Sequence, residues 1–192
     1  MQPKGKSMGQ GSKAGIQKAV FFDRDGVINI DTNYTYKIED FQFIEEFFEV
    51  AKFFKKLDYK LVVITNQSGI QRGFYTVPDF LKLSAYMQKS LQDRLGFSMD
   101  RIYFCPFLNS VNRKPNSGML LKARDDLALD LSNSVMIGDR ISDMEAGSNA
   151  GLKSLYLISD KNSMPVKKDG LVDSDIKYKN VTSLLEILKD FK

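Results

Sequence analysis

The chain has 192 residues, of which 43% are hydrophobic and 27% charged, so it can bury one sizeable core but is short for two domains. It contains one cysteine, Cys105, and no histidine, which excludes intramolecular disulfides, Ser-His or Cys-His catalysis, and zinc sites built from cysteine and histidine. No apolar run approaches the roughly 20 residues that a membrane-spanning helix needs, so we expect a cytoplasmic protein without membrane contact. Any acid–base chemistry must use Asp, Glu, Lys, Tyr or the thiol.

The basic charge of the chain is confined to its first residues. The formal net charge is +4, and residues 1–18 carry four of the 28 basic residues and no acidic one. The remaining chain balances 24 basic against 24 acidic residues. This distribution predicts a flexible, basic, Gly-rich leader over residues 1–18 and a single domain over residues 19–192. A nucleic-acid partner is not expected, because such proteins carry a basic patch on the folded surface.

Short apolar runs alternate along the chain with longer amphipathic stretches. In chain order, the pattern predicts a strand at 19–22, a helix at 41–57, a strand at 61–64, a helix from about 78 to 95, a strand at 101–104, a helix at 117–129, a strand at 134–137, a short helix near 141–150, a strand at 154–158 and a closing helix at 181–191. Thr76-Val77-Pro78-Asp79 resembles a capping box at the start of the second helix. Alternating strands and helices predict an α/β fold with a three-layer, Rossmann-like, mainly parallel sheet.

Polar side chains follow several of the predicted strands. Asp23 follows the first strand and Thr65 the second. Lys114 lies beyond the third strand, and Asp139 follows the fourth. In open α/β sheets, ligands bind at the carboxyl ends of the strands, near a topological switch point. We therefore expect these four side chains to share one edge of the sheet.

Asp23 and Asp25 are two carboxylates that follow a buried strand at a spacing of two residues. A carboxylate can attack phosphorus to form an aspartyl-phosphate, and a neighbouring carboxylic acid can protonate the leaving alcohol and later activate water. Because the chain has no histidine, a carboxylic acid is needed for the second role. The pair alone favours an exposed Asp-x-Asp turn, which is common in any sequence, so the catalytic hypothesis depends on the residues around it.

Asp139 is the candidate that would complete a metal site. Mg²⁺ prefers oxygen ligands, usually one or two carboxylates with waters and phosphate oxygens. Asp23, Asp139 and the backbone carbonyl of Asp25 would form such a site, and Asp143 could hold a metal-bound water. The metal would screen the repulsion between an anionic nucleophile and an anionic phosphate. Alternatively, Asp139 caps the following helix and Asp143 is its solvated partner.

Thr65 and Lys114 are candidates for stabilising a phosphoryl group. Thr65 could donate its hydroxyl, helped by the backbone N–H groups of residues 66–69, since such clusters bind anions. Alternatively, Thr65 is an N-cap or turn residue. Lys114 could neutralise charge in the transition state, although a lone lysine is usually a solvated surface residue.

Together these residues resemble the motifs of the haloacid-dehalogenase (HAD) phosphatase superfamily. The matching segments are Asp23-Arg24-Asp25-Gly26, Ile64-Thr65-Asn66-Gln67-Ser68-Gly69, Arg113-Lys114-Pro115 and Ile137-Gly138-Asp139-Arg140-Ile141-Ser142-Asp143-Met144. Within the superfamily, the chain most resembles the D-glycero-D-manno-heptose 1,7-bisphosphate 7-phosphatases, alongside the histidinol-phosphate phosphatases. The resemblance implies a HAD-like fold without a large cap domain, a Mg²⁺ cofactor, and a sugar bisphosphate substrate from the synthesis of bacterial surface glycans such as lipopolysaccharide. It also implies substrate contacts by Asp31, Asn33, Tyr34, Asn66, Gln67, Ser68, Arg113 and Arg140.

One segment departs from the pattern of this family. Its members commonly carry a Cys-x-His…Cys-x-Cys loop that binds structural zinc just before Arg-Lys-Pro. Here Cys105 alone remains, Phe107 stands at the histidine position, and the loop is short. A lone thiolate cannot hold zinc, so we predict no zinc and a buried Cys105 that packs as a small hydrophobe. The shortened loop leaves the identity of the sugar open. Arg140 in place of the usual lysine keeps the charge but changes the donor geometry.

The sequence thus predicts a monomeric, Mg²⁺-dependent phosphatase for a small phosphorylated sugar, with Asp23, Asp25, Thr65 and Lys114 as catalytic residues. A histidinol-phosphate phosphatase would use the same machinery and differ in its pocket. A DNA 3′-phosphatase is disfavoured by the neutral charge of residues 19–192. A phospho-acceptor signalling domain also uses Asp, Thr, Lys and Mg²⁺, but such domains usually carry the acceptor after the third strand. A catalytically inactive binding homologue is disfavoured, because each catalytic position holds a competent residue.

Overall fold

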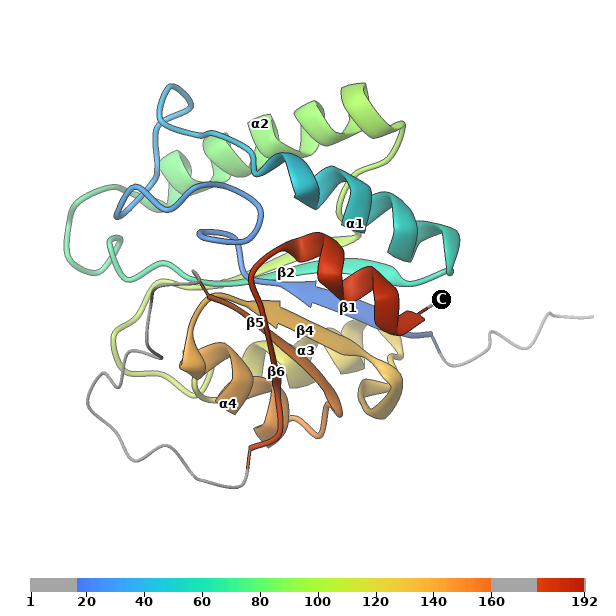
Figure 1. Ribbon diagram of the computed structural model, residues 1–192. Helices are drawn as coiled ribbons and strands as arrows, with labels where there is room; N and C mark the ends of the chain where they lie inside the picture. Colours follow the sequence, from blue (N-terminus) through green and yellow to red (C-terminus); the bar gives the residue numbers. More distant parts are fainter. Residues whose placement is uncertain (1–16, 160–175, 192) are drawn as a thin grey trace, which may run out of the picture.

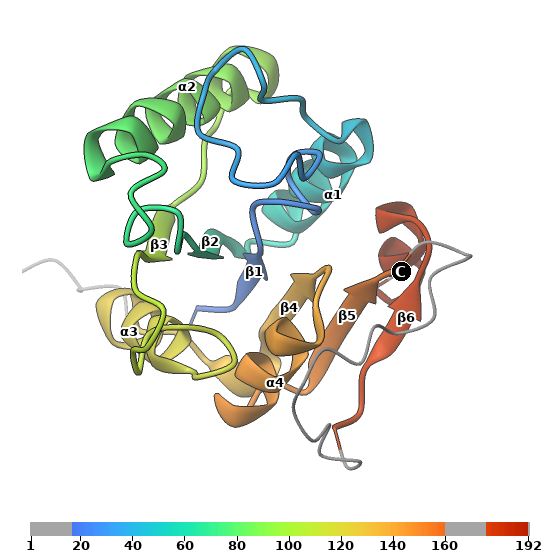
Figure 2. The same cartoon turned by 90° about the vertical axis from the view of Figure 1, so that its left-hand side faces the viewer.

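The centre of the protein is a single parallel β-sheet. The computed structural model describes residues 17–159 and 176–191, so residues 1–16 of the expected leader lie outside the described part. The strands are β1 (Ala19–Phe22), β2 (Lys60–Asn66), β3 (Arg101–Cys105), β4 (Val135–Gly138), β5 (Ser154–Ile158) and β6 (Lys179–Val181). They lie in the order β3-β2-β1-β4-β5-β6, and each neighbouring pair is parallel (Figure 2).

Helices cover both faces of this sheet, which confirms the predicted three-layer α/β fold. They are α1 (Glu45–Lys56), α2 (Val77–Leu95), α3 (Gly118–Leu127), α4 (Ile141–Asn149) and the 3₁₀ helices η1 (Leu131–Asn133) and η2 (Leu184–Phe191). Figure 1 shows α1, α2 and η2 on one side of the sheet and α3 and α4 on the other. None of the helices in the described part of the chain has the length and apolar character required to cross a bilayer.

The alternation of side chains along β1 explains how both layers are held. Val20 and Phe22 are buried in one apolar cluster with residues of α1, α2 and η2. Ala19 and Phe21 point the other way and are buried in a second cluster with residues of α3 and α4. Because successive residues of a strand face opposite sides, a strand that is apolar at every position belongs in the middle of three layers.

Helix α1 begins later than the periodicity of the sequence predicts. We expected a helix from residue 41, but α1 starts at Glu45 and Ile44 is extended. Residues 41–44 instead pair with the start of the β1–α1 connection: Phe43 forms an antiparallel bridge to Asn29, and the Ile44 N–H donates to the carbonyl of Ile28 at 2.9 Å. These tertiary hydrogen bonds replace the first helical turn, and local spacing carries no information about them.

The C-terminal segment also differs from the prediction. In place of the expected helix at 181–191, Val181 ends the short strand β6, and the 3₁₀ helix η2 begins at Leu184. The Glu46 carboxylate of α1 accepts hydrogen bonds from the N–H of Leu184 and the hydroxyl of Ser183 at the start of η2. Leu184 and Ile187 are buried three residues apart, a spacing that suits three residues per turn.

The strand order places a topological switch point between β1 and β4. The chain leaves β1 toward β2 on one side, whereas β4 is its other neighbour and leads toward β5. Asp23 follows β1, and its N–H donates to the carbonyl of Ile137 in β4 at 3.0 Å. Asp139 follows β4 directly. Ligands bind at such a point because the connections diverge there and leave a crevice.

Asp100 joins the start of β2 to the start of β3. Its carboxylate accepts a hydrogen bond from the Leu61 N–H at 2.9 Å and pairs with the ammonium groups of Lys60 and Lys55. Burial alone would raise the pKa of Asp100, but these three donors outweigh it and hold the pKa below its ordinary value. The carboxylate therefore stabilises the fold when it is ionised.

We expect Asp100→Asn to lower the free energy of unfolding by about 1–2 kcal/mol at neutral pH, because charged hydrogen bonds are lost. A depressed pKa stabilises the native state above the unfolded pKa of about 3.9, so the difference from wild type should shrink as pH falls below about 4. Urea denaturation at several pH values measures this. Asp93→Asn is the matched control, because its pair with Lys89 is exposed and worth at most about 1 kcal/mol. An effect of Asp100→Asn no larger than the control's would contradict the assignment.

Candidate active site

A cleft of about 730 Å³ opens at the carboxyl edge of the sheet. It is bounded by the segments that follow β1, β2 and β4 and by the segment that leads into α3. All the residues predicted to be catalytic or to contact substrate line it: Asp23, Asp25, Asp31, Asn33, Tyr34, Thr65, Asn66, Gln67, Ser68, Arg113, Lys114 and Arg140. The structure therefore brings these residues together in one cleft, while the role of each residue stays a prediction.

Asp23 and Lys114 form a buried ion pair at the floor of the cleft. The Lys114 ammonium lies 3.0 Å from Asp23 Oδ1 and 2.6 Å from Asp143 Oδ1, and it donates to the carbonyl oxygen of Ile64 at 2.9 Å. Burial would lower the pKa of Lys114, but the two carboxylates outweigh it and keep the amine charged. Lys114 is 3% exposed, so it is not the solvated surface lysine of the alternative interpretation.

Three carboxylates meet beside this lysine. Oxygens of Asp23, Asp139 and Asp143 all lie within 4.8 Å of one another. Burial raises the pKa of Asp23 to about 6, with Lys114 opposing the effect. Burial, followed by repulsion from Asp23 and Asp143, raises the pKa of Asp139 to about 8. One lysine does not offset three carboxylates, so the cluster fits a further cation.

The residues of this cluster suit Mg²⁺. The donors are carboxylate oxygens, which are the ligands that Mg²⁺ prefers. Asp139 Oδ1 is buried and has no hydrogen-bond partner among the described residues. Asp139 does not cap α4, because Asp143 Oδ2 accepts the hydrogen bond from the Arg140 N–H that completes the N-terminal cap. Asp143 is thus itself a member of the carboxylate cluster, and its predicted role in holding a metal-bound water stays a prediction. The predicted contribution of the Asp25 carbonyl stays a prediction.

Gly26 makes room for Asp139 in this cluster. Its φ is +83°, a backbone conformation that residues other than glycine rarely adopt, and a Cβ there would lie 2.3 Å from Asp139 Oδ2. We expect Gly26→Ala to raise the Mg²⁺ concentration for half-maximal activity by at least about tenfold, as displaced metal environments commonly do. A titration of activity against Mg²⁺ measures this. Gly73→Ala is the control: it shares a positive φ but meets nothing within 4 Å. Equal effects of the two variants on the Mg²⁺ requirement would mean that backbone strain at a positive φ causes the loss, and not contact with Asp139.

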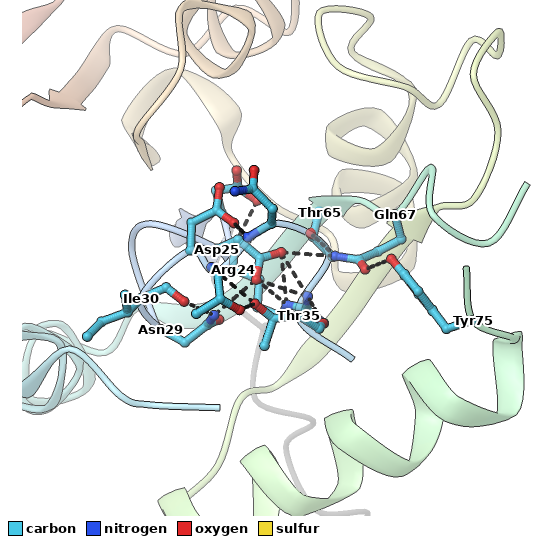
Figure 3. A network of polar contacts seen from close by, with 12 residues as sticks. Arg24, Asp25, Asn29, Ile30, Thr35, Thr65, Gln67 and Tyr75 are labelled. Carbon is cyan, nitrogen blue, oxygen red and sulfur yellow. Dashed lines mark hydrogen bonds and ion pairs between the residues drawn. The ribbon is translucent and has the colours of Figure 1, made fainter. Parts of the chain in front are cut away.

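The Asp25 carboxylate is surrounded by side-chain donors. Arg24 contacts both of its oxygens through Nε and Nη2, at 2.8 to 3.2 Å. Asn29 donates to Oδ1 at 3.0 Å and Gln67 to Oδ2 at 3.2 Å (Figure 3). Arg24 also donates to the carbonyl of Thr35, which ties the β1–α1 connection to the same point. The side chain of Asp25 is therefore held apart from the carboxylate cluster, in an ordered position at the edge of the cleft.

Two residues expected to contact substrate are bonded mainly to the protein. The amide of Asn66 makes two hydrogen bonds to the backbone of Lys114, at 3.0 and 3.1 Å. Gln67 is 2% exposed, and its amide bonds Asp25, Thr65 and Tyr75. Both side chains thus fix neighbours of the predicted catalytic residues, although both reach the wall of the cleft.

The predicted substrate residues of the β1–α1 connection lie across the cleft mouth. Asp31 Oδ2 accepts from Arg140 Nη2 at 2.9 Å, which links this connection to the segment after β4. Asn33 and Tyr34 have φ values near +60°, and the Tyr34 ring packs against Phe74. Arg140 remains 63% exposed at its side chain, so its charge is available at the mouth.

Residues that no prediction assigned also belong to the cleft. Arg72 and Tyr75 line it, and Arg24 is almost fully buried behind it. Arg72 and Tyr75 lie between β2 and the capping box of α2, and their positions depend on the course of that loop. Arg24 stands inside the first motif, but a charged residue gives no sign in the sequence that it will be buried.

The Cys105 segment agrees with the prediction for the thiol. Cys105 is 1% exposed, packs in the α3 and α4 cluster, and contacts the carbonyl of Phe107 at 3.6 Å. Phe107 and Val111 are exposed in the short loop that follows. The expectation that no zinc binds stays a prediction.

Comparisons with known proteins agree with this geometry. The family model described as "HAD-hyrolase-like" matches residues 111–176. A crystal structure of D,D-heptose 1,7-bisphosphate phosphatase from B. bronchiseptica, complexed with magnesium and phosphate, superposes with a TM-score of 0.69. It is 26% identical and covers 74% of this chain and 80% of its own. These matches, together with the parallel sheet and the acidic cluster at its switch point, place the chain among the HAD-like hydrolases.

Curated relatives give the family. The D-glycero-alpha-D-manno-heptose-1,7-bisphosphate 7-phosphatase of Campylobacter jejuni is 47% identical over 90% of this chain and 96% of its own. The D-glycero-beta-D-manno-heptose-1,7-bisphosphate 7-phosphatase of Helicobacter pylori strain J99 is 45% identical over 90% of this chain and 97% of its own. The chain belongs to the D-glycero-D-manno-heptose-1,7-bisphosphate 7-phosphatase family, which confirms the resemblance drawn from its motifs.

Proposed function

We propose that the protein is a Mg²⁺-dependent phosphatase that removes the 7-phosphate of D-glycero-D-manno-heptose 1,7-bisphosphate. The observation that carries the proposal is the meeting of Asp23, Asp139 and Asp143 beside Lys114 at the switch point, where Asp23, Asp143 and Lys114 line the cleft. The names of the Campylobacter jejuni and Helicobacter pylori relatives supply the substrate. The volume of about 730 Å³ lies within the usual range for small-molecule sites.

The first step forms a covalent intermediate. A carboxylate oxygen of Asp23 attacks the phosphorus, and the bond between phosphorus and the leaving sugar oxygen breaks. Asp25 gives a proton to that oxygen, so the sugar leaves as an alcohol. Lys114 holds Asp23 in place, and the Thr65 hydroxyl donates a hydrogen bond to a phosphoryl oxygen.

The second step regenerates the enzyme. Asp25 takes a proton from water, the water oxygen attacks the aspartyl-phosphate, and the bond between phosphorus and Asp23 breaks. Asp23 and Asp139, with the Asp25 carbonyl, would hold Mg²⁺, which would supply positive charge that offsets the repulsion between carboxylate and phosphate. The two steps together return Asp23 to a free carboxylate and Asp25 to its protonated form.

The cations around the cleft suit a substrate with two phosphates. Arg72, Arg113 and Arg140 line the cleft beyond the catalytic lysine. Planar guanidinium groups bind phosphate through paired hydrogen bonds, and they would hold the sugar's other phosphate away from Asp23. The proposal includes the monomeric state and cytoplasmic location expected from the sequence, and both stay predictions.

The deciding experiment measures phosphate release in the presence of Mg²⁺ from the α and β anomers of the heptose bisphosphate and from histidinol phosphate. We expect the highest kcat/KM on a heptose bisphosphate, with the 1-phosphate retained in the product when it is followed by phosphorus NMR. Both anomers are needed, because the two relatives named above differ in theirs. Preference for histidinol phosphate would overturn the substrate but leave the chemistry, and loss of the 1-phosphate would overturn the regiochemistry.

A further inference from the structure

One buried amide contacts two of the residues to which the proposed function gives chemical roles. Gln67 Nε2 donates to Thr65 Oγ1 at 2.8 Å and to Asp25 Oδ2 at 3.2 Å. Thr65 and Gln67 are 1% and 2% exposed, so little water competes for these bonds. The position of this amide therefore affects the acid–base carboxylate and the phosphoryl-binding hydroxyl together.

Tyr75 fixes the direction in which that amide points. Its hydroxyl donates to Gln67 Oε1 at 2.5 Å, so the –NH₂ end of the amide faces Asp25 and Thr65 (Figure 3). Burial raises the pKa of Tyr75 to about 12, which keeps the hydroxyl protonated and able to donate. Without this hydroxyl, the buried Oε1 would lack its partner and the amide could rotate.

The ring of Tyr75 is itself held in place. It is 5% exposed and stacks on Tyr36 with an interplanar angle of 7° and ring centroids 5.2 Å apart. The loop leaves space for it at Gly69, where a Cβ would lie 2.2 Å from Tyr75 Cε1. The hydroxyl therefore has a fixed location relative to Gln67.

The directions of these hydrogen bonds have a chemical consequence for Thr65. Because Thr65 Oγ1 accepts from Gln67, its own proton remains free to donate to an acceptor in the cleft. Asp25 Oδ2 accepts from the same amide and from Arg24 Nη2, while Asn29 donates to Oδ1. An amide rotated by half a turn would present an oxygen to both groups and remove both effects.

We propose that Tyr75 and Gln67 are positioning residues, which through a hydroxyl-to-amide relay hold Asp25 for proton transfer to the leaving oxygen and direct the Thr65 proton toward the phosphoryl group. The inference rests on the proposed function, because it assumes that Asp25 is the general acid. Neither residue need touch the reacting atoms. A purely structural role would weaken the enzyme equally toward all phosphate monoesters, whereas the relay acts most where the leaving oxygen needs a proton.

The test compares leaving groups in Tyr75→Phe, which removes one hydroxyl and keeps the ring. We expect kcat/KM for heptose bisphosphate to fall by about 10- to 100-fold, as small misplacements of catalytic groups do. For p-nitrophenyl phosphate, whose phenolate leaves without a proton, we expect a loss of no more than about threefold, caused by Thr65 alone. In an Asp25→Asn background, Tyr75→Phe should cost no more than about threefold on either substrate.

Two further variants keep the result interpretable. Tyr156→Phe also removes a tyrosine hydroxyl bond, to Asp190, outside the cleft, and should leave both values of kcat/KM unchanged. Gln67→Met breaks the relay at its centre, should give the same split between substrates, and should not be made worse by adding Tyr75→Phe. Thermal melting checks that each variant is folded.

The outcomes separate the two proposals. The relay is overturned if Tyr75→Phe lowers kcat/KM equally for both substrates. It is also overturned if Tyr75→Phe still lowers kcat/KM by about 10- to 100-fold in the Asp25→Asn background. In both cases the phosphatase assignment stands. If the wild-type protein hydrolyses other alkyl phosphates but not heptose bisphosphate, the proposed substrate is overturned. The leaving-group comparison for Tyr75→Phe then uses the alkyl phosphate with the highest kcat/KM. A wild-type protein that hydrolyses no phosphate monoester overturns both.

Discussion

Asp23→Asn should lower kcat by at least about 10³-fold, because loss of the nucleophile removes the covalent pathway. The amide nitrogen is not nucleophilic enough to replace a carboxylate oxygen, and no other described carboxylate lies in the same position between Lys114 and the N–H of Arg24. Steady-state phosphate release measures the loss. Rapid acid quench with a phosphorus-32-labelled substrate should trap labelled protein for wild type and none for the variant.

Asp40→Asn is the matched control for this substitution. Asp40 is an exposed aspartate of the same β1–α1 connection and does not line the cleft. Its replacement should leave kcat and KM within a factor of two of wild type, as is usual for surface substitutions worth at most about 0.5 kcal/mol. An Asp23→Asn protein that is folded and turns over at the wild-type rate would mean that another group attacks the phosphorus.

Lys114→Met should affect both stability and activity. It removes the ammonium that lies between Asp23 and Asp143 and leaves buried carboxylates unpaired, a change that costs about 3–5 kcal/mol in comparable ion pairs. We expect a loss of that size in the free energy of unfolding measured by denaturant in EDTA. Turnover should also fall by at least about 10²-fold, because the cation that stabilises the phosphoryl group is gone.

Two variants control for this interpretation. Lys122→Met removes a lysine whose pair with Asp126 is exposed, so it should leave the free energy of unfolding close to the wild-type value. The double variant Lys114→Met/Asp143→Asn removes one of the stranded charges, and it should recover part of the lost stability without recovering activity. If Lys114→Met is as stable as Lys122→Met, the buried carboxylates do not depend on this lysine.

The sheet could be predicted because its signals are local. The strands that became β1, β4 and β5 are short apolar runs, and their predicted limits differ from the observed ones by at most one residue. The start of α1 and the β6–η2 segment could not be predicted in the same way. The backbone groups of Gln42 and Ile44 bond to residues 28–30, and Val181 pairs with Ile158 of β5. Such hydrogen bonds depend on tertiary structure.

The positions of some residues of the site could likewise be predicted from the sequence, and those of others could not. The shared position of Asp23, Thr65 and Asp139 could be predicted because each lies at or directly after the end of an apolar strand, and parallel strands bring their carboxyl ends to one edge. Tyr75 was not, since nothing in its immediate sequence indicates that its hydroxyl reaches Gln67. The hydrogen bonds of Asn66 to the backbone of Lys114 also depend on how two loops meet after folding.

Because β1 pairs with β4, the acidic cluster can form only after the chain has been synthesised beyond β4. Asp23 emerges from the ribosome 116 residues before Asp139, and the two meet when Phe22 aligns with Ile137. A nascent chain that ends before β4 can place β1 beside β2 but carries neither Asp139 nor Asp143. Phosphatase activity can thus serve as a reporter of complete folding across both halves of the sheet, because contacts of long sequence separation form late.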